Sequence, residues 1–223
     1  MSHKIARVIT IDGLASSGKT SISKKLSEKL GYYFLDSGIL YRSVAYICLT
    51  ESLEKNTNLL INNLENNLEV VADKKKHYEV NYRGSDISEH LYNEEIGIYA
   101  SIVSQKSEIR EYLMKLQHNC VKLPGLVANG RDMGSKVFPD ADFKLFITAE
   151  LAVRAERRFK QLTVAGTEAS LEKITSQLAE RDKNDKNRKI SPLIAPTGSI
   201  EIDSSHLNVD RILDKILELY KIW

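Results

Sequence analysis

The segment Gly13–Thr20 constrains the fold most, because it matches the phosphate-loop pattern G-x-x-x-x-G-K-[ST] at every fixed position. It follows an apolar run, Ile5–Ile11, that predicts a buried strand. It precedes apolar residues at a helical spacing of four, Ile22, Leu26 and Leu30. A strand, a glycine-containing loop and a helix in this order predict a phosphate-binding unit.

The residue types of this loop suit phosphate binding. Gly13 and Gly18 let the chain wrap tightly, so that backbone N–H groups and the helix N-terminus point at one phosphate. Lys19 then reaches the outer phosphates of a nucleotide, and the Thr20 hydroxyl is placed for Mg²⁺. We therefore expect a nucleoside triphosphate and a magnesium ion at this loop.

Short apolar runs flanked by turn residues predict further strands that are buried on both faces. With the first strand, they are Ile5–Ile11, Tyr32–Leu35, Leu126–Ala128, Phe143–Ile147 and Ile200–Ile202. Near-continuous apolar runs separated by helical patterns are typical of parallel sheets. The expected fold class is α/β, a five-stranded parallel sheet of the P-loop NTPase type with helices on both faces.

Two stretches interrupt this alternation. The first, residues 53–99, holds an Asn-rich segment and two β-like runs, Leu68–Ala72 and His77–Tyr82, around a Lys-rich turn. We interpret it as an inserted lobe, and we assign no function to its Asn or Lys residues. The second, residues 151–189, is rich in arginine. It predicts a helix over Leu151–Arg158 and a second helix that ends at Arg181-Asp182, before a loop over Lys183–Ile190.

Composition excludes several classes of function. The chain has 223 residues and a formal net charge of +2, so bulk positive charge does not indicate a nucleic-acid partner. No window reaches the ~18 consecutive apolar residues of a membrane span, and the start of the chain lacks a secretory apolar region. We expect a cytoplasmic protein in which Cys48 and Cys120 are buried free thiols.

A GTPase-type switch is the weaker interpretation of the phosphate loop. No glycine of the chain has an aspartate three positions before it, and no Asn-Lys-x-Asp sequence occurs. The motifs that sense a γ-phosphate and a guanine base are therefore missing. A phosphoryl-transfer enzyme is the stronger interpretation.

Two further polar turns follow predicted strands. In the first, Ser37 is a candidate helix N-cap, and Tyr41 and Arg42 fall in the first turns of that helix, where an Arg can receive a second phosphate. An ordinary cap with a surface Arg is the alternative. The second turn, Gly130–Gly134, carries adjacent Arg131 and Asp132, for which a simple ion pair is the alternative.

Taken together, these segments resemble bacterial cytidylate kinases. The resemblance rests on the phosphate loop, on Asp36-Ser37-Gly38 with Tyr41-Arg42, on Leu123-Pro124-Gly125-Leu126 leading to Gly130-Arg131-Asp132-Met133-Gly134, and on Arg181-Asp182, Asp185, Asn187-Arg188 and Ser191-Pro192-Leu193. It covers essentially the whole chain. It implies one kinase domain over residues 1–223, with a core at 1–52, 100–150 and 190–223, a CMP-binding insert at 53–99 and a lid at 151–189.

The resemblance also implies substrates and site residues. ATP would donate its γ-phosphoryl group to CMP or dCMP with Mg²⁺ as cofactor, in a monomer without nucleic-acid or membrane partners. The implied ATP-binding residues are Gly13, Ser16, Ser17, Gly18, Lys19, Thr20, Ser21 and Arg157, with Thr20 as metal ligand. The implied CMP-binding residues are Ser37, Tyr41, Arg42, Ser101, Arg110, Arg131, Asp132, Arg181, Asp185 and Arg188. The implied catalytic residues are Lys19, Arg131, Arg181 and Arg188.

Base recognition by Asp132 is chemically reasonable. Cytosine has an exocyclic amine that a carboxylate accepts, whereas uracil has a carbonyl at that position. An unmet buried polar group costs about 1–3 kcal/mol, which corresponds to discrimination against UMP of roughly ten- to a hundredfold. The charged run over 181–189, by composition alone a solvated loop, becomes functional through the resemblance only at Arg181, Asp185 and Arg188.

One position departs from the family pattern. The family usually has Asp immediately before Gly130, where it suits a magnesium ion held through water, whereas this chain has Asn129. Three explanations compete: Asp36 or Asp12 compensates, the enzyme is slow, or the chain has drifted from the family activity. A kinase for another small acceptor and a nucleotide-binding protein without transfer activity are the alternative functions.

Overall fold

A computed structural model describes residues 6–164, 166 and 168–222. Ile5, at the start of the first predicted strand, and Met1–Lys4, which the leader prediction used, lie outside the described residues. In chain order the elements are β1 (Arg7–Gly13), α1 (Lys19–Leu30), β2 (Tyr33–Asp36), α2 (Ser37–Thr50), α3 (Thr57–Asn67), β3 (Leu68–Ala72), β4 (Tyr78–Tyr82), β5 (Ser85–Asp86), a 3₁₀ turn (Ser88–His90), α4 (Glu94–Val103), α5 (Ser107–Asn119), β6 (Gly125–Asn129), a π-helical turn (Met133–Val137), β7 (Phe143–Thr148), α6 (Leu151–Val164), α7 (Leu171–Asn187), β8 (Ile200–Asp203) and α8 (Val209–Ile222).

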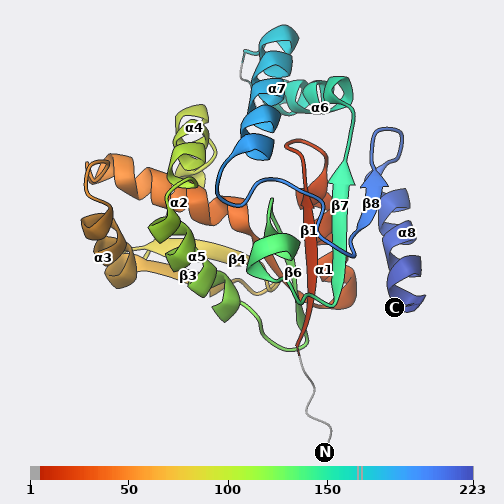
Figure 1. The fold of residues 1–223 in the computed structure, drawn as a ribbon, viewed down its shortest axis with the longest axis horizontal. Helices are drawn as coiled ribbons and strands as arrows, with labels where there is room; N and C mark the ends of the chain where they lie inside the picture. The colour runs from red at the N-terminus through yellow and green to blue at the C-terminus, as the bar shows by residue number, and fades with distance from the viewer. Residues whose placement is uncertain (1–5, 165, 167, 223) are drawn as a thin grey trace, which may run out of the picture. The chain divides into compact units, whose positions relative to one another are not determined.

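The predicted five-stranded sheet is confirmed, with strand order β2-β6-β1-β7-β8 (Figure 1). β7 pairs in parallel with both β1 and β8, and Ile147 lies opposite Gly13 on one side and Ile202 on the other. All five apolar runs found in the sequence form strands of this sheet. Their side chains are largely buried because helices, and not water, lie against both faces of such a sheet.

The chain divides into two compact units. We call residues 8–26 and 129–223 the phosphate-loop unit, because they contain Gly13–Thr20. We call residues 27–128, together with the start of the chain, the hairpin unit, because they contain the antiparallel sheet β3-β4-β5. The two β-like runs predicted in the insert are β3 and β4. These strands pair with each other in antiparallel orientation, and Leu68 of β3 lies opposite Tyr82 of β4. β5 adds only two residues, both exposed, beside the end of β4.

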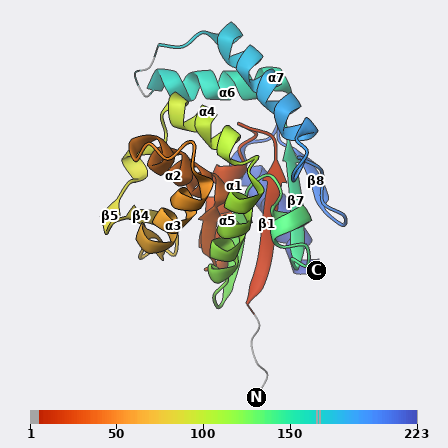
Figure 2. The same cartoon turned by 60° about the vertical axis from the view of Figure 1, so that its left-hand side comes forward.

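Helices α6 and α7 pack against each other in the phosphate-loop unit, side by side in both views (Figures 1 and 2). Their contact is a small apolar cluster in which Ala155 of α6 meets Ile174 and Leu178 of α7. Ala15 of the phosphate loop belongs to the same cluster. The two helices therefore pack against the phosphate loop, although they lie more than a hundred residues after it in the sequence.

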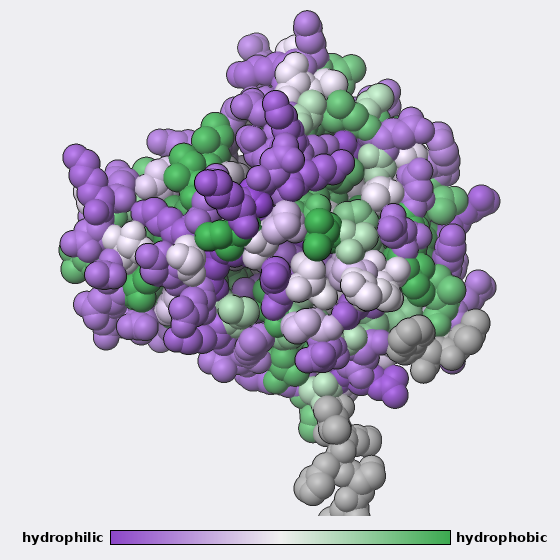
Figure 3. Space-filling model, in the orientation of Figure 1, coloured by the Kyte–Doolittle hydropathy of each residue, from purple (hydrophilic) through white to green (hydrophobic). Residues whose placement is uncertain are grey.

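The prediction that a loop begins at Lys183 is wrong, because α7 continues to Asn187. No glycine or proline occurs between Arg181 and Pro192, so nothing in the chain forces a stop there. The extra turn is also held at its end, since the Asp185 carbonyl accepts a hydrogen bond of 2.8 Å from the Leu193 N–H. Most of α7 is polar, and hydrophilic side chains dominate the face over α7 in Figure 3.

The predicted N-cap of α2 is displaced by one residue. Asp36, not Ser37, is the cap, and its carboxylate accepts the Gly38 N–H at 3.0 Å. The cause is that the backbone of Asp36 is still extended, as a cap requires, whereas Ser37 has already entered the helix. The free thiols of Cys48 and Cys120 are buried, as predicted. Across the described part of the chain, every helix is too short or too polar to span a bilayer.

Candidate active site

The phosphate loop connects β1 to α1 with the backbone geometry that its glycines permit. Gly13 has φ +141°, and a Cβ there would lie 1.9 Å from the Ile147 carbonyl oxygen, so no side chain fits. Gly18 has φ +86°, and Ser16 also adopts a positive φ, of 58°. These turns bring the chain around so that α1 begins at Lys19, with its N-terminal N–H groups at the loop.

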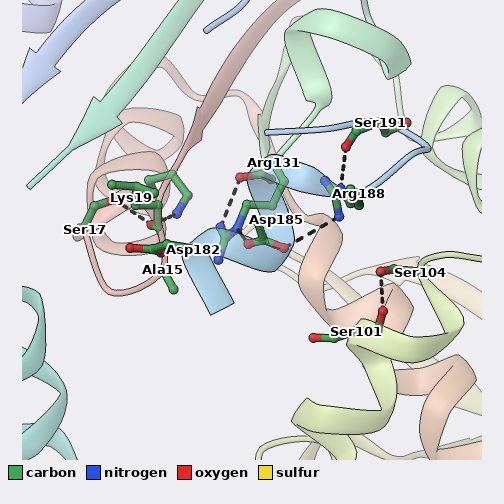
Figure 4. A network of polar contacts seen from close by, with 12 residues as sticks. Ala15, Ser17, Lys19, Ser101, Ser104, Arg131, Asp182, Asp185, Arg188 and Ser191 are labelled. Atoms are coloured by element: carbon green, nitrogen blue, oxygen red, sulfur yellow. Dashed lines mark hydrogen bonds and ion pairs between the residues drawn. The ribbon is translucent and has the colours of Figure 1, made fainter. Parts of the chain in front are cut away.

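Lys19 and Ser17 hold the loop from within. The Lys19 ammonium donates to the Leu14 carbonyl at 2.6 Å, and the Ser17 hydroxyl donates to the same oxygen at 3.0 Å. Both side chains are buried, and both lie inside the curve of the loop in Figure 4. Ser21, in the first turn of α1, is exposed. The ammonium group of Lys19 is thus already placed at the loop that the sequence assigns to phosphates.

Thr20 contacts the residue that departs from the family pattern. The Asn129 side-chain amide donates to the Thr20 hydroxyl at 3.0 Å. Asn129 is 3% exposed, and its side-chain oxygen has no hydrogen-bond partner among the described residues. The amide nitrogen of Asn129 therefore contacts the Thr20 hydroxyl at the start of α1, while the amide oxygen of Asn129 is left without a partner.

Ser204, which sequence reasoning missed, fixes Arg157 beside the loop. Arg157 donates to the Ser204 hydroxyl at 3.0 Å and to its carbonyl at 2.6 Å. The same hydroxyl lies 2.8 Å from the Ser17 carbonyl and 3.0 Å from the Thr148 carbonyl. Ser204 is 187 positions from Ser17 in the sequence. The one sequence signal for this contact is that Ser204 directly follows the predicted strand Ile200–Ile202, at the edge of the sheet where the phosphate loop also lies.

Arg154 joins the phosphate loop to α7. It is 3% exposed and donates to the Asp182 carboxylate at 2.6 Å. It also donates to the Ala149 carbonyl at 2.9 Å and to the Ala15 carbonyl at 3.3 Å. One arginine of the predicted arginine-rich helix is thus buried, and the Asp182 carboxylate neutralises its charge.

Asp185 is the centre of a second cluster. Its carboxylate accepts from the Arg131 Nε at 3.0 Å and lies 3.8 Å from an Arg188 nitrogen, and Figure 4 shows both arginines directed toward it. Arg181 adds a third positive charge. Burial alone would raise the pKa of the Asp185 carboxyl, but the three guanidinium groups hold it below its ordinary value. Asp185 is therefore an anion within a positive cluster.

Helical spacing separates the functional candidates in α7 from their charged neighbours. Arg181, Asp185 and the C-cap Arg188 follow each other at intervals of four and three, so they share one side of the helix, and all three are partly buried. Lys183, Lys186 and Lys189 are exposed. The three residues of this run for which the resemblance implies a function are thus partly buried, whereas its three lysines face solvent.

In the hairpin unit, the side chain of Arg42, a residue of α2, reaches the segment that precedes α4. Its guanidinium donates to the Leu91 carbonyl at 2.7 Å and approaches the Tyr92 ring, 5.8 Å from its centre. A Cβ at Gly97 would lie 3.1 Å from the same guanidinium, so the helix backbone comes close at this point. Ser37, at the start of α2, is 5% exposed.

Arg110, Tyr41 and Ser101 form the other group of predicted acceptor residues in this unit. The Arg110 guanidinium stands over the Tyr41 ring, 5.5 Å from its centre, and donates to the Ser104 carbonyl at 3.1 Å. The Ser104 hydroxyl in turn donates to the Ser101 carbonyl at 2.9 Å, as Figure 4 shows. These contacts join α2, α4 and the start of α5 around three of the predicted residues.

A parallel sheet with a phosphate loop between β1 and α1 defines an α/β fold of the P-loop NTPase type. A solved structure from Eubacterium ventriosum, described as an uncharacterized protein, shares this fold with a TM-score of 0.55 at 13% sequence identity, over 96% of this chain and 97% of that chain. The likeness concerns the fold alone. The cytidylate kinase family model matches residues 9–222. The chain belongs to the cytidylate kinase family, and it is an enzyme.

Individual relatives agree over nearly their whole length. The cytidylate kinase of Aeromonas salmonicida strain A449 is 37% identical over 215 residues, 96% of this chain and 94% of that protein. The cytidylate kinase of Fervidobacterium nodosum is 38% identical over 214 residues, 96% of this chain and 95% of that protein. The resemblance noted in the sequence is confirmed.

Proposed function

We propose that this enzyme transfers the γ-phosphoryl group of ATP to CMP or dCMP, giving ADP and CDP or dCDP. The observation that carries the proposal is family membership over residues 9–222, in a chain whose phosphate loop and arginine cluster belong to one compact unit. Transfer between two phosphates needs in-line positioning and neutralised charge, and little covalent chemistry. A general base is not required, because the acceptor oxygen is already ionised near neutral pH.

ATP binds through the phosphate loop in this proposal. Backbone N–H groups from Gly13 to Ser21 and the start of α1 face its phosphates, and Lys19 exchanges the Leu14 carbonyl for a phosphate oxygen. Arg157 stays attached to Ser204 beside the loop and adds positive charge on the donor side. A carbonyl oxygen is a weaker partner for an ammonium than a phosphate, which favours the exchange.

The cluster around Asp185 supplies the remaining charge. Arg131, Arg181 and Arg188 stabilise the negative oxygens of the transferring group. Without a nucleotide, the Asp185 carboxylate offsets one of these three positive charges and reduces the repulsion between the guanidinium groups. When the acceptor binds, its phosphate takes over part of that balance, and an Asp185 oxygen is available for a ribose hydroxyl.

The chemistry of the residues at Thr20 fits a magnesium ion. Mg²⁺ prefers oxygen ligands, keeps several waters and is bound mostly through nucleotide phosphates. Thr20 would supply its hydroxyl, and the unpartnered Asn129 oxygen would accept a hydrogen bond from a metal-bound water. The ion would neutralise phosphate charge there. Asn129 lacks the negative charge of an aspartate, so we expect this ion to be held more weakly than beside a carboxylate.

The acceptor-binding residues of this proposal are those that the sequence resemblance implies. Ser37, Tyr41, Arg42 and Arg131 hold the CMP phosphate in this proposal, while Ser101, Arg110 and Asp132 contact the cytosine. Arg42 and Arg110 are oriented by backbone carbonyls and aromatic rings, contacts that a phosphate or a base can replace. Asp132 is 2% exposed, so an acceptor base that failed to satisfy its carboxylate would be disfavoured.

An assay of ADP release with CMP, dCMP, UMP and AMP tests the proposal. The expected result is turnover with both cytidine nucleotides, at least tenfold more efficient than with UMP. The absence of turnover with CMP and dCMP would overturn it, and a preference for AMP or UMP would assign another acceptor. We also propose that the enzyme is cytoplasmic and monomeric. Light scattering of the purified enzyme tests its oligomeric state.

A further inference from the structure

Asp12 is a buried carboxylate that neither the phosphate loop nor the proposed contacts to nucleotides use. It lies near the end of β1, immediately before Gly13, and it is fully buried. One carboxylate oxygen accepts the Met133 N–H at 2.8 Å, and the other accepts the Gly134 N–H at 2.8 Å. Both oxygens thus bind the backbone of a segment about 120 residues further along the chain.

The segment that Asp12 binds follows Arg131 and Asp132 directly. The residue before Arg131 is also attached to β1, because the Gly130 N–H donates to the Ile11 carbonyl at 3.0 Å. At Gly134 an added Cβ would lie 2.7 Å from the Thr10 hydroxyl oxygen, so the turn sits close against the strand. Three consecutive residues of β1 therefore define the path of residues 130–134.

The charge of Asp12 makes this attachment costly. Burial raises the pKa of its carboxyl from 3.8 to about 6, against the effect of the Gly134 and Met133 hydrogen bonds. The Asp132 carboxylate also raises this pKa, and the Lys19 ammonium lowers it. Because the pKa is higher in the folded than in the unfolded chain, the Asp12 contribution to stability is full below pH 3.8 and is lost as the pH rises through 6. Ionised Asp12 is therefore unfavourable for stability at neutral pH.

We propose that Asp12 is a positioning residue for the acceptor site: its carboxylate fixes the turn that presents Arg131 and Asp132. The inference rests on the proposed function for the identity of the acceptor. Two N–H donors aimed at one carboxylate need the ionised form, since a neutral amide or acid can accept fully from only one of them. A displacement of about 1 Å at a substrate-positioning residue can reduce the rate about a hundredfold. Asp12 thus trades stability for a fixed geometry.

The variant Asp12→Asn separates positioning from a structural role. It loses one of two hydrogen bonds but also removes a buried charge, so its thermal midpoint at pH 7.5 should stay close to that of the unmodified enzyme. We expect kcat/KM for CMP to fall about ten- to a hundredfold, with the KM for ATP changed less than threefold. Asp142→Asn is the matched control, because Asp142 also accepts a backbone N–H of β1, from Val8 at 2.7 Å, at an exposed site.

Two pH-dependent readouts complete the test. In the unmodified enzyme, the amide protons of Met133 and Gly134 should shift together in NMR spectra with a midpoint near pH 6. The fall of kcat/KM for CMP at acidic pH should differ between the unmodified enzyme and Asp12→Asn. The phosphate of the nucleotide also ionises near pH 6, but it does so equally with both enzymes, so the comparison removes its effect. A variant with full efficiency for CMP and an unchanged acid limb would overturn the inference. A variant that only loses thermal stability, with acceptor kinetics intact, would overturn it too.

The amide titration needs no substrate, so it remains informative if the enzyme fails to use CMP. In that case the proposed function fails while the attachment of the turn by Asp12 can still be established. If CMP is a substrate and Asp12→Asn behaves like Asp142→Asn, the proposed function stands and the positioning role fails.

Discussion

Arg154 and Arg131 of the phosphate-loop unit make different contacts from Arg42 and Arg110 of the hairpin unit. In the phosphate-loop unit, Arg154 and Arg131 each contact a carboxylate, at 2.6 and 3.0 Å. In the hairpin unit, the contacts of Arg42 and Arg110 include backbone carbonyls and the faces of tyrosine rings. A buried ion pair is expensive to break, whereas carbonyl and ring contacts are readily exchanged for those of an anion. We infer that Arg154 maintains the architecture of the phosphate-loop unit, whereas Arg42 and Arg110 of the hairpin unit are available to the acceptor.

The largest expected effect tests the loop on which this comparison depends. Lys19→Ala should lower kcat about a thousandfold, because a preorganised donor to the transferring phosphates is lost. Steady-state kinetics with CMP and ATP measures it. Lys29→Ala, on the exposed side of the same helix, is the control and should retain normal turnover. A Lys19→Ala enzyme within tenfold of normal kcat would show that this ammonium is not a catalytic group.

The structural side of the comparison predicts a loss of stability. Arg154→Ala leaves the Asp182 carboxylate without its partner, which should cost about 3 kcal/mol in the free energy of unfolding. Chemical denaturation measures this change. The double variant Arg154→Leu with Asp182→Leu should be clearly more stable than Arg154→Ala, since it leaves no charge unpaired. Equal stability of both variants would mean that the ion pair is not what fixes α6 to α7.

For the arginines proposed to bind the acceptor, we expect a large effect on substrate binding and a small effect on stability. Arg42→Ala should raise the KM for CMP roughly ten- to a hundredfold, the value of one or two hydrogen bonds to a charged group. Its free energy of unfolding should change by less than about 1 kcal/mol. Arg83→Ala is the matched control in the same unit, because Arg83 also lies over a tyrosine ring, 5.0 Å from the centre of Tyr82. If Arg42→Ala unfolds the protein while KM stays normal, the distinction between the units is wrong.

Base recognition gives a smaller and more specific effect. Asp132→Ala should reduce the preference for CMP over UMP by roughly ten- to a hundredfold and leave the KM for ATP nearly unchanged. The ratio of kcat/KM values for the two acceptors is the measurement. Equal losses with CMP and UMP would contradict the role of Asp132 in reading the base.

The smallest expected effect concerns the metal. Asn129→Asp adds a negative charge beside the Thr20 hydroxyl and should tighten Mg²⁺ binding a few-fold at physiological ionic strength. Paramagnetic resonance of Mn²⁺ with the enzyme and ADP measures affinity without turnover. Asn208→Asp, an exposed position of the same unit, adds the same charge elsewhere and should leave the affinity unchanged. Weaker binding by Asn129→Asp would argue against a metal role for this residue.

The strands of the five-stranded sheet and the phosphate loop could be predicted because each is encoded in a short stretch of sequence. Apolar runs mark the strands, and the glycines of the loop have no substitute at their backbone angles. The contacts of Ser204 with Ser17 and of Asp12 with Met133 could not be predicted, because each joins residues more than a hundred positions apart. The end of α7 was missed for another reason: charged residues without glycine or proline are compatible with both a helix and a loop.

The edge strand β5 of the hairpin unit has a consequence for how the enzyme behaves at high concentration. A sheet edge can recruit the strand of another molecule, and the usual protections are shortness and charge. β5 has both, since it is two residues long and ends in Asp86, whose carboxylate accepts from the backbone and hydroxyl of Ser88. The Ser88 hydrogen bonds lower the pKa of Asp86, so the charge persists into mildly acidic solution. This edge is therefore guarded against edge-to-edge aggregation, and insertions intended for labelling should not lengthen it.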